Sequence, residues 1–182
     1  MEVNRLSLNR GSQLFDILCN PTGVSLPSST LESGTGIAEY DSTLLAPYCR
    51  GRSRSCDSGD LLIGRVSEMN SPNTIDGCFD GQDTTENYTE SVKRIVVTSV
   101  NGDDLRAGDL VKIQATVISF SVQDRVDFYY ASNAKSPDWT LIAVVAPSFG
   151  ETDISLPYKR FPDITYTLPK CLSSSGCQQA IR

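Results

Sequence analysis

The six cysteines are the residues whose type and spacing point most clearly to chemistry in this chain of 182 residues. The sequence contains no histidine, which excludes Ser-His and Cys-His catalytic pairs and every metal site that uses imidazole. No two cysteines have the Cys-x-x-Cys spacing that is typical of metal sites. An even number of widely separated cysteines indicates three disulfides and therefore an oxidising, extracellular compartment. They are Cys19, Cys49, Cys56, Cys78, Cys171 and Cys177.

Four of the cysteines form two short loops. Six residues, including Gly51, separate Cys49 from Cys56, and the five residues Leu-Ser-Ser-Ser-Gly separate Cys171 from Cys177. Both segments are flexible enough to bring the Cα atoms to the roughly 4.4–6.8 Å that a disulfide requires. We therefore predict a local bridge within each pair.

Other arrangements that could support catalysis are weak. Asp103 and Asp104 are adjacent in a polar turn, where their side chains point apart into solvent. The glycine pair in Gly34-Thr-Gly36 lacks the strand-to-helix context that a phosphate loop needs. The sequence therefore predicts a protein that is not an enzyme.

An acidic segment raises the one cofactor hypothesis, which is calcium. Five carboxylates lie within fifteen residues, and hard oxygen ligands at that density suit calcium, although the spacing is not that of an EF-hand. A solvated acidic loop is the alternative. The candidate ligands are Asp76, Asp80, Asp83, Glu86 and Glu90. Asn87-Tyr-Thr in the same segment is an N-glycosylation sequon, so a glycan on Asn87 is expected in a eukaryotic secretory context, with an unmodified polar loop as the alternative.

The overall charge limits the partners. A net charge of -6 and a pI near 4.6 disfavour nucleic acids and anionic membranes, which both require clustered cations. The arginines at 50, 52 and 54 lie between Cys49 and Cys56 and suit a constrained exposed loop better than a phosphate site. No apolar run approaches the roughly 20 residues of a membrane-spanning helix. We expect no nucleic-acid partner and no membrane span.

The secondary structure that positions the candidate residues is predicted to be β-strand. Val111, Ile113, Ala115 and Val117 alternate with polar residues, which is the pattern of a strand with one buried face. The same alternation recurs at 126–130 and 139–145, and 93–100 is a fourth apolar run, with turn residues between the runs. The pattern predicts a four-strand antiparallel meander that packs against a second sheet. The expected fold is all-β, an antiparallel sandwich of immunoglobulin or jelly-roll type.

The chain divides into two parts. Residues 1–30 contain two candidate strands, at 3–8 and 14–19, followed by a proline-containing linker. Residues 31–182 form the predicted sandwich, whose first half is expected to consist mainly of loops stapled by disulfides. Within that half the clearest apolar run is 61–66, which fits a short strand or one helical turn.

Aromatic residues support a second hypothesis, a sugar-binding surface. Tyr129, Tyr130 and Trp139 lie on or beside neighbouring predicted strands, and exposed aromatic rings can hold sugar rings by face contacts. One alternating set must face inward. We expect Phe128 and Trp139 in the core and Tyr129 as the exposed candidate.

Several segments resemble a repeat module of secreted and surface proteins of algae and other microbes, sometimes appended to extracellular peptidases. They are Ser33–Cys49, Cys56–Arg65 and Pro72–Cys78. Asp124–Ile142 and Thr165–Pro169 are also similar to the non-catalytic C-terminal β-domain of secreted bacterial leucyl aminopeptidases. The resemblance runs from about Ser33 to the C-terminus. It implies an accessory β-sandwich and carries no catalytic residues.

The resemblance also implies a role for the N-terminal residues. In that family the segment similar to Gln178–Arg182 continues into one more strand, Val-Asn-Phe-Arg-Tyr, and then a cysteine. The segment Val3–Leu8, with Leu6, followed by Cys19, looks like that strand and its cysteine moved to the front, and Cys19 is the partner left for Cys78. Residues 1–19 are therefore expected to complete a sandwich, either their own or that of a neighbouring copy by strand addition.

Together these observations predict a non-enzymatic structural subunit or repeat of an extracellular or cell-surface assembly. Head-to-tail strand addition between copies does not close on itself, so the assembly would be a filament. The alternatives are a carbohydrate-binding or targeting accessory domain of a secreted enzyme, or a viral capsid surface protein. Residues 1–10 contain no apolar leader segment, so we expect either that a leader was removed or that the chain is part of something longer.

Overall fold

The computed structural model describes residues 13–17, 34–62, 91–119, 124–146, 158–170 and 177–182. All regular secondary structure within these residues is β-strand, so the protein is all-β over the part described, as predicted. The strands, in chain order, are β1 (Gln13–Ile17), β2 (Thr35–Ile37), β3 (Glu39–Asp41), β4 (Ala46–Cys49), β5 (Ser55–Asp57), β6 (Ser91–Ser99), β7 (Leu110–Ile118), β8 (Val126–Ala131), β9 (Thr140–Val145), β10 (Tyr158–Arg160), β11 (Ile164–Thr167) and β12 (Cys177–Ile181).

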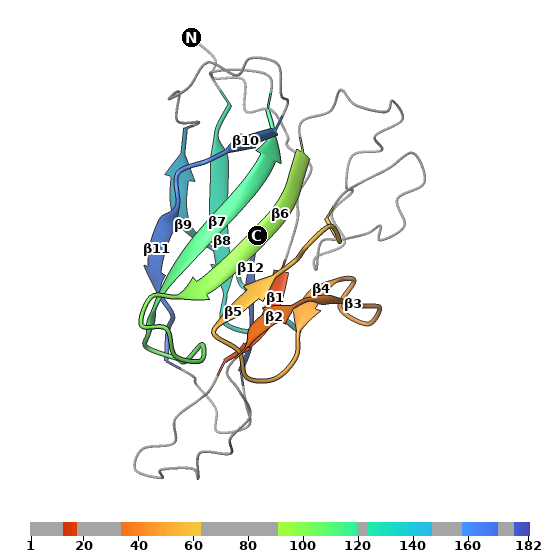
Figure 1. Ribbon diagram of the computed structural model, residues 1–182, viewed down its shortest axis with the longest axis vertical. Helices are drawn as coiled ribbons and strands as arrows, with labels where there is room; N and C mark the ends of the chain where they lie inside the picture. Colours follow the sequence, from red (N-terminus) through yellow and green to blue (C-terminus); the bar gives the residue numbers. More distant parts are fainter. Residues whose placement is uncertain (1–12, 18–33, 63–90, 120–123, 147–157, 171–176) are drawn as a thin grey trace.

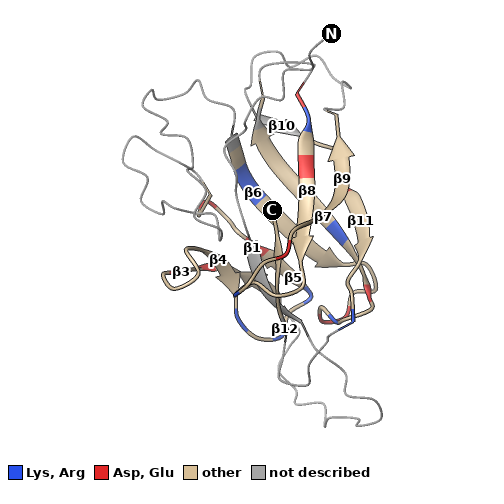
Figure 2. Ribbon diagram, turned by 180° about the vertical axis from the view of Figure 1, so that it is seen from behind, with Lys and Arg blue, Asp and Glu red and all other residues tan. Residues whose placement is uncertain are grey.

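These strands form two sheets. The first has the order β10-β7-β6-β5-β2, and β11 pairs with β7 as well. The second has the order β3-β4-β1-β12-β8-β9. Strands β8 and β9 lie behind β6 and β7 in Figure 1 and in front of them in Figure 2, which is seen from the opposite side.

The longest ladder joins β6 to β7 and has the burial that the sequence predicted. Val111, Ile113, Ala115 and Val117 are all buried, whereas the polar residues between them are partly exposed. The polar loop at 101–109 connects the two strands, and Gly102 and Gly108 have φ values of 80° and 92° that favour glycine. Alternation along the strand therefore identified the core face correctly.

The predicted four-strand meander is wrong. The four predicted strands exist, as β6, β7, β8 and β9, but β6 and β7 belong to one sheet and β8 and β9 to the other. The chain thus changes sheets between β7 and β8. A period of two along a strand distinguishes its two faces but does not tell which sheet the strand joins.

Strand β9 also differs from the prediction, in the direction of one of its side chains. Alternation predicted Leu141 on the inner face, yet 49% of Leu141 is exposed. The register between β8 and β9 shifts at Phe128 and Tyr129, where Ile142 is the additional residue on β9. A bulge of this kind turns the following side chains to the opposite face. Ile142 and Ala143 both contact the core.

The sheets are mixed, whereas the sequence predicted only antiparallel pairing. The pairs β1–β4 and β2–β5 are parallel, and the remaining pairs are antiparallel. The segment 35–57 provides four short strands where few regular elements were expected. Strands of three or four residues are too short for a periodic pattern to reveal them. Leu61 and Leu62 lie in a turn, and Leu62 is buried in the core.

One core cluster contains side chains from both sheets. Residues such as Val97 and Ile113 come from the first sheet, and Phe128 and Ile181 from the second. A smaller cluster lies elsewhere on the second sheet and consists of Ala46, Tyr48, Ala131, Ala134 and Ala180, with Leu44 and Trp139 packed against it. Because Ala180 and Ile181 are adjacent on β12 yet belong to different clusters, the second sheet has apolar contacts on both faces.

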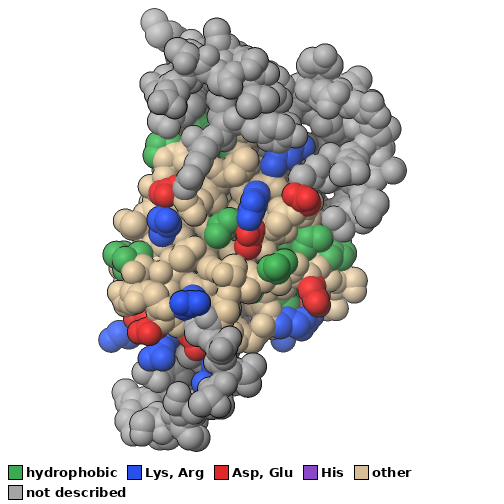
Figure 3. Space-filling model, viewed as in Figure 1, with side chains coloured by type: hydrophobic (Ala, Val, Ile, Leu, Met, Phe, Trp, Pro, Cys, Tyr) green, Lys and Arg blue, Asp and Glu red, His purple; other side chains and the backbone are tan. Residues whose placement is uncertain are grey.

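Charged side chains are dispersed over the described surface that Figure 3 displays. Figure 3 shows Lys and Arg side chains interspersed with Asp and Glu over the face it displays, without a single large patch of either sign. Exposed apolar residues on the described part include Ile37, Leu141 and Val144. The last two lie on β9, which is an edge strand of the second sheet.

Candidate functional site

The N-terminal strand β1 occupies an interior position in the second sheet. It pairs antiparallel with β12 over Gln13–Ile17 and parallel with β4 at Leu14 and Phe15. We call the space between β4 and β12 the strand slot. An interior strand satisfies the backbone hydrogen-bonding groups of both neighbours, so an empty slot would leave two strand edges unpaired.

Most of the described side chains on the two strands that border the slot are buried. Every residue of β4 is buried, including Tyr48 and Cys49, and on β12 Gln179, Ala180 and Ile181 are at most 1% exposed. Gln179 lies opposite Phe15 in the register, and its Oε1 atom has no hydrogen-bond partner among the described residues. The slot is therefore a mostly apolar environment in which a strand is held chiefly by backbone pairing and burial.

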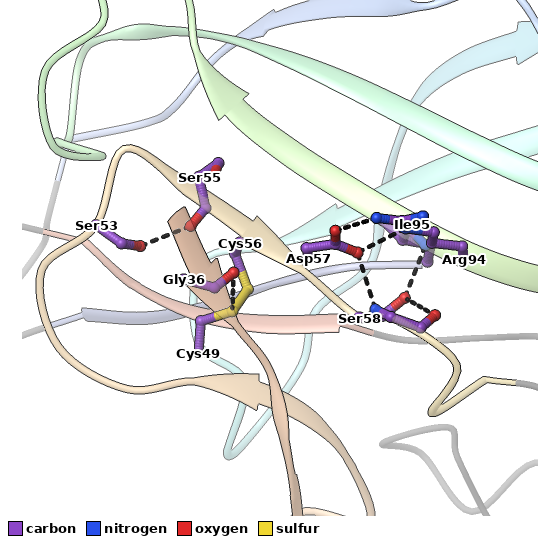
Figure 4. The surroundings of a disulfide bond; sticks show 10 residues. Gly36, Cys49, Ser53, Ser55, Cys56, Asp57, Ser58, Arg94 and Ile95 are labelled. Carbon is purple, nitrogen blue, oxygen red and sulfur yellow. Dashed lines mark hydrogen bonds and ion pairs between the residues drawn. A yellow bond between two sulfur atoms is a disulfide. The ribbon is translucent and has the colours of Figure 1, made fainter. Parts of the chain in front are cut away.

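The predicted Cys49–Cys56 disulfide is present and stands at the side of the slot. It joins β4 of the second sheet to β5 of the first, with a Cα separation of 5.7 Å. Both cysteines belong to the common core. The bridge is short in sequence but connects the two sheets (Figure 4).

A glycine is required beside this bridge. A Cβ atom added to Gly36 on β2 would lie 2.8 Å from the Ser55 carbonyl oxygen of β5 and 2.8 Å from Ser53 Oγ. The first contact is with backbone, which cannot move aside without breaking the pairing of β2 with β5. Because it has no Cβ atom, Gly36 allows β2 to lie close to β5. Figure 4 shows Gly36 next to the disulfide.

Next to Cys56, an ion pair connects β5 to β6. The Arg94 guanidinium donates two hydrogen bonds to the Asp57 carboxylate, one of them from Nε at 2.7 Å. Ser58 reinforces the junction, because its Oγ accepts a hydrogen bond from the Ile95 amide at 2.9 Å. Figure 4 shows these contacts beside the disulfide. The side chain of Asp57 is 14% exposed, so solvent screens the pair only in part.

The Arg94 guanidinium lowers the pKa of Asp57, burial of the carboxyl opposes this effect, and the Gly59 amide contributes to the lowering. A carboxyl whose pKa is lowered in the folded state stabilises the fold at pH values above its unfolded pKa of about 3.9. That stability is lost as the pH falls through the lower, folded pKa. Stability that depends on this pair should therefore disappear in acid.

Asp57→Asn tests this pH dependence. At pH 7 the substitution is expected to reduce the free energy of unfolding by about 1 kcal/mol, because it removes a charged, partly buried hydrogen-bond acceptor. At pH 2–3 the difference between variant and wild type should be much smaller. Urea denaturation at both pH values measures it, and Asp103→Asn in an exposed turn is the control. Equal differences at the two pH values would show that the charge of Asp57 is not the cause.

On the opposite face of β4 from Cys49, Tyr48 is fixed by its neighbours. Asp41 accepts hydrogen bonds from the Thr43 and Leu44 amides at 2.8 and 3.0 Å and forms an ion pair with Arg50. The Arg50 guanidinium carbon lies 4.6 Å from the centroid of the Tyr48 ring. Burial raises the pKa of Asp41, but the two backbone hydrogen bonds and Arg50 outweigh it, so the pKa is lowered. Arg50 thus stabilises the turn before β4 and covers Tyr48.

The structure alters the aromatic hypothesis. Phe128 is buried in the core as predicted, whereas Trp139 is half-buried and packs against the smaller cluster. Tyr129 is half-buried as well. The guanidinium carbon of Arg182 lies 4.6 Å from the Trp139 ring centroid and 5.5 Å from that of Tyr129. Arg182 therefore occupies ring faces that a sugar would need.

Many of the predicted site residues lie outside the described part of the chain. These are the calcium candidates Asp76, Asp80, Asp83, Glu86 and Glu90, the sequon at Asn87, the strand-addition residues Val3, Leu6 and Leu8, and Cys19, Cys78 and Cys171. The backbone of Cys177 begins β12, but its side chain is not described. The corresponding predictions remain predictions.

The described residues contain no group of three or more Cys, Asp or Glu side chains that could hold a metal ion. They also contain no helix that is long and apolar enough to cross a membrane.

Comparison of the chain with protein-family models, with curated proteins and with solved structures finds no match in any of the three.

Sequence reasoning missed part of the site. It predicted the Cys49–Cys56 pair and a strand at 14–19, of which residues 14–17 lie in β1, but not the pair Asp57–Arg94 or the position of Tyr48. Asp57 and Arg94 are 37 residues apart, and only the pairing of β5 with β6 brings them together. Tyr48 beside Cys49 carried no signal beyond an aromatic residue next to a cysteine.

Proposed function

We propose that this chain is a non-enzymatic structural subunit of an extracellular or cell-surface assembly whose copies are joined by strand addition. The observation that carries the proposal is the interior position of β1 between β12 and β4. The position between β12 and β4 can be filled by β1 of the same chain or by the equivalent strand of a second copy. Head-to-tail repetition of this step gives a filament.

The same proposal describes the domain as a β-sandwich related in architecture to immunoglobulin and jelly-roll domains. Two sheets that share one core and are joined by the Cys49–Cys56 bridge support this description. The Cys49–Cys56 disulfide favours an oxidising compartment, which supports the extracellular location. A glycan on Asn87, calcium in the acidic segment and a third disulfide between Cys19 and Cys78 remain compatible additions.

The alternative proposal, a carbohydrate-binding or targeting domain, receives less support. It needs open aromatic faces, and Arg182 stacks against both Trp139 and Tyr129. A capsid surface protein would be a special case of a structural subunit. We therefore favour the strand-joined assembly.

A pair of cysteines across the slot tests the proposal. Leu14 lies opposite Ala180, and opposite residues in an antiparallel pair have Cα atoms roughly 4.5–5.5 Å apart, which permits a disulfide. In the variant Leu14→Cys/Ala180→Cys, we expect monomers cross-linked within one chain in dilute solution. At high protein concentration we expect a ladder of multimers on a non-reducing gel that collapses on reduction.

The matched control is Val96→Cys/Gln114→Cys, which places cysteines opposite each other on β6 and β7. This pair should give monomers at every concentration, so a ladder in the control would report scrambling of the natural cysteines. If the Leu14/Ala180 pair gives only monomers at the highest concentration that can be reached, strand addition between copies is refuted.

A further inference from the structure

A side-chain hydrogen bond joins the two strands that border the slot. Gln178 Nε2 on β12 donates to the Tyr48 hydroxyl on β4 over 2.8 Å. These strands are not neighbours in the sheet, because β1 lies between them. The bond therefore connects one border of the slot directly to the other.

The register shows where this bond runs. Leu14 of β1 pairs with both Tyr48 and Ala180, and Asp16 pairs with Gln178. Adjacent strands are about 4.8 Å apart, so β4 and β12 are separated by roughly 10 Å. Tyr48 and Ala180 belong to the smaller cluster, and Gln178 has the same orientation as Ala180 because the two are two residues apart on β12. The bond thus crosses the backbone of β1 on the face opposite the common core, and we call it the clasp.

Both ends of the clasp are held by residues outside β1. Tyr48 is 3% exposed and is covered by Arg50, which is itself paired with Asp41. The Gln178 carbonyl oxygen accepts a hydrogen bond from the Ala134 amide at 2.8 Å. These contacts do not depend on which strand fills the slot. The clasp can therefore close over a strand from this chain or from another copy.

We propose that the clasp is a gate that controls the rate at which a strand enters or leaves the slot. This inference depends on the proposed strand addition. The core face of the slot is closed by the packed core, so a strand must leave through the opposite face, where the clasp lies. Backbone pairing by itself holds any extended strand, whereas the clasp must break before β1 can move out and must open before another strand can enter.

The test uses the full chain, a fluorescent synthetic peptide of residues 1–18 as probe, and the variant Tyr48→Phe. The variant keeps the ring that packs against Arg50 and loses only the hydroxyl. If the clasp breaks before the strand moves, Tyr48→Phe should take up the peptide about fivefold faster than wild type, equivalent to about 1 kcal/mol, a typical value for one hydrogen bond. Hydrogen exchange of the amides of residues 13–17 should accelerate by a similar factor.

Two further variants make the comparison specific. Tyr129→Phe removes a tyrosine hydroxyl from β8 in the same sheet and should leave both rates unchanged. Gln178→Met removes the other partner of the clasp, and the double variant Tyr48→Phe/Gln178→Met should be no faster than either single variant, because both lose the same bond.

The outcomes separate this inference from the proposed function. Absence of peptide uptake in every variant would contradict strand addition, while faster amide exchange of β1 in Tyr48→Phe would still support the clasp. Uptake at equal rates in wild type and Tyr48→Phe, with equal amide exchange, would refute the clasp and leave strand addition intact. An equal acceleration in Tyr129→Phe would show general loosening of the sheet and would also refute the clasp.

Discussion

Removal of residues 1–19 is expected to destabilise the protein by at least about 5 kcal/mol, which is the lower end of the total stability of a typical domain. The deletion removes β1, whose backbone pairs with β12 over five residues and with β4 over two. It leaves the edges of β4 and β12 unpaired. It also uncovers the region around Gln179, Ala180 and Ile181, which are fully buried in the intact protein. The truncated chain should unfold at a much lower urea concentration or fail to fold cooperatively.

The measurement is urea denaturation followed by tryptophan fluorescence and circular dichroism. Trp139 is the only tryptophan and packs against the smaller cluster on the same sheet as β1, so its emission reports on this region. Addition of an excess of peptide 1–19 should restore much of the stability by mass action. The control is deletion of residues 1–9, which keeps β1. Equal stability of the 1–19 deletion and the full chain would show that β1 is not part of the folded sheet.

Phe128→Ala is expected to reduce the free energy of unfolding by about 3–5 kcal/mol. Phe128 is 2% exposed, lies in the middle of β8 and belongs to the core cluster that both sheets share. The cost has two parts, the loss of apolar burial and the cavity that remains between the sheets. The midpoint of urea unfolding should fall while the slope stays nearly the same.

Leu141→Ala is the matched control for this substitution. Leu141 lies on β9, next to β8 in the same sheet, but 49% of it is exposed, so we expect a change of less than about 1 kcal/mol. Similar losses in the two variants would mean that Phe128 does not occupy the common core. A larger loss for Leu141→Ala would reverse the assignment of inner and outer residues on β8 and β9.

The strands with the longest periodic patterns could be predicted from the sequence with good bounds. The alternation at 111–117 lies in β7, Leu110–Ile118, and the run at 126–130 lies in β8, Val126–Ala131. Their buried residues were identified because side chains on a strand alternate between two faces. The short strands β2–β5 could not be predicted, because three or four residues do not display a period. Their conformation depends on the strands with which they pair.

The distribution of strands between the sheets was not predictable. Strands β7 and β8 follow each other in the sequence but pair with different partners, and β1 is inserted between β4 and β12 although more than 150 residues separate it from β12. A pattern of apolar residues specifies only that a face is buried, and any partner of suitable length satisfies that requirement. The candidate site depends on this distribution, because the slot and the clasp exist only when β4, β1 and β12 are adjacent.

The Cys49–Cys56 bridge shows both what the local sequence determines and what the tertiary structure determines. The sequence by itself determined the pairing, since six flexible residues bring these two sulfurs within bonding distance more readily than any distant cysteine. It also determined the all-β class, because the alternation at 111–117 and 126–130 suits no other element. Only the tertiary structure decided that the bridge joins two sheets and that Tyr48, next to Cys49, meets Gln178 across another strand. Local spacing governs which residues can meet within a loop, whereas contacts over 130 residues depend on how the whole chain packs.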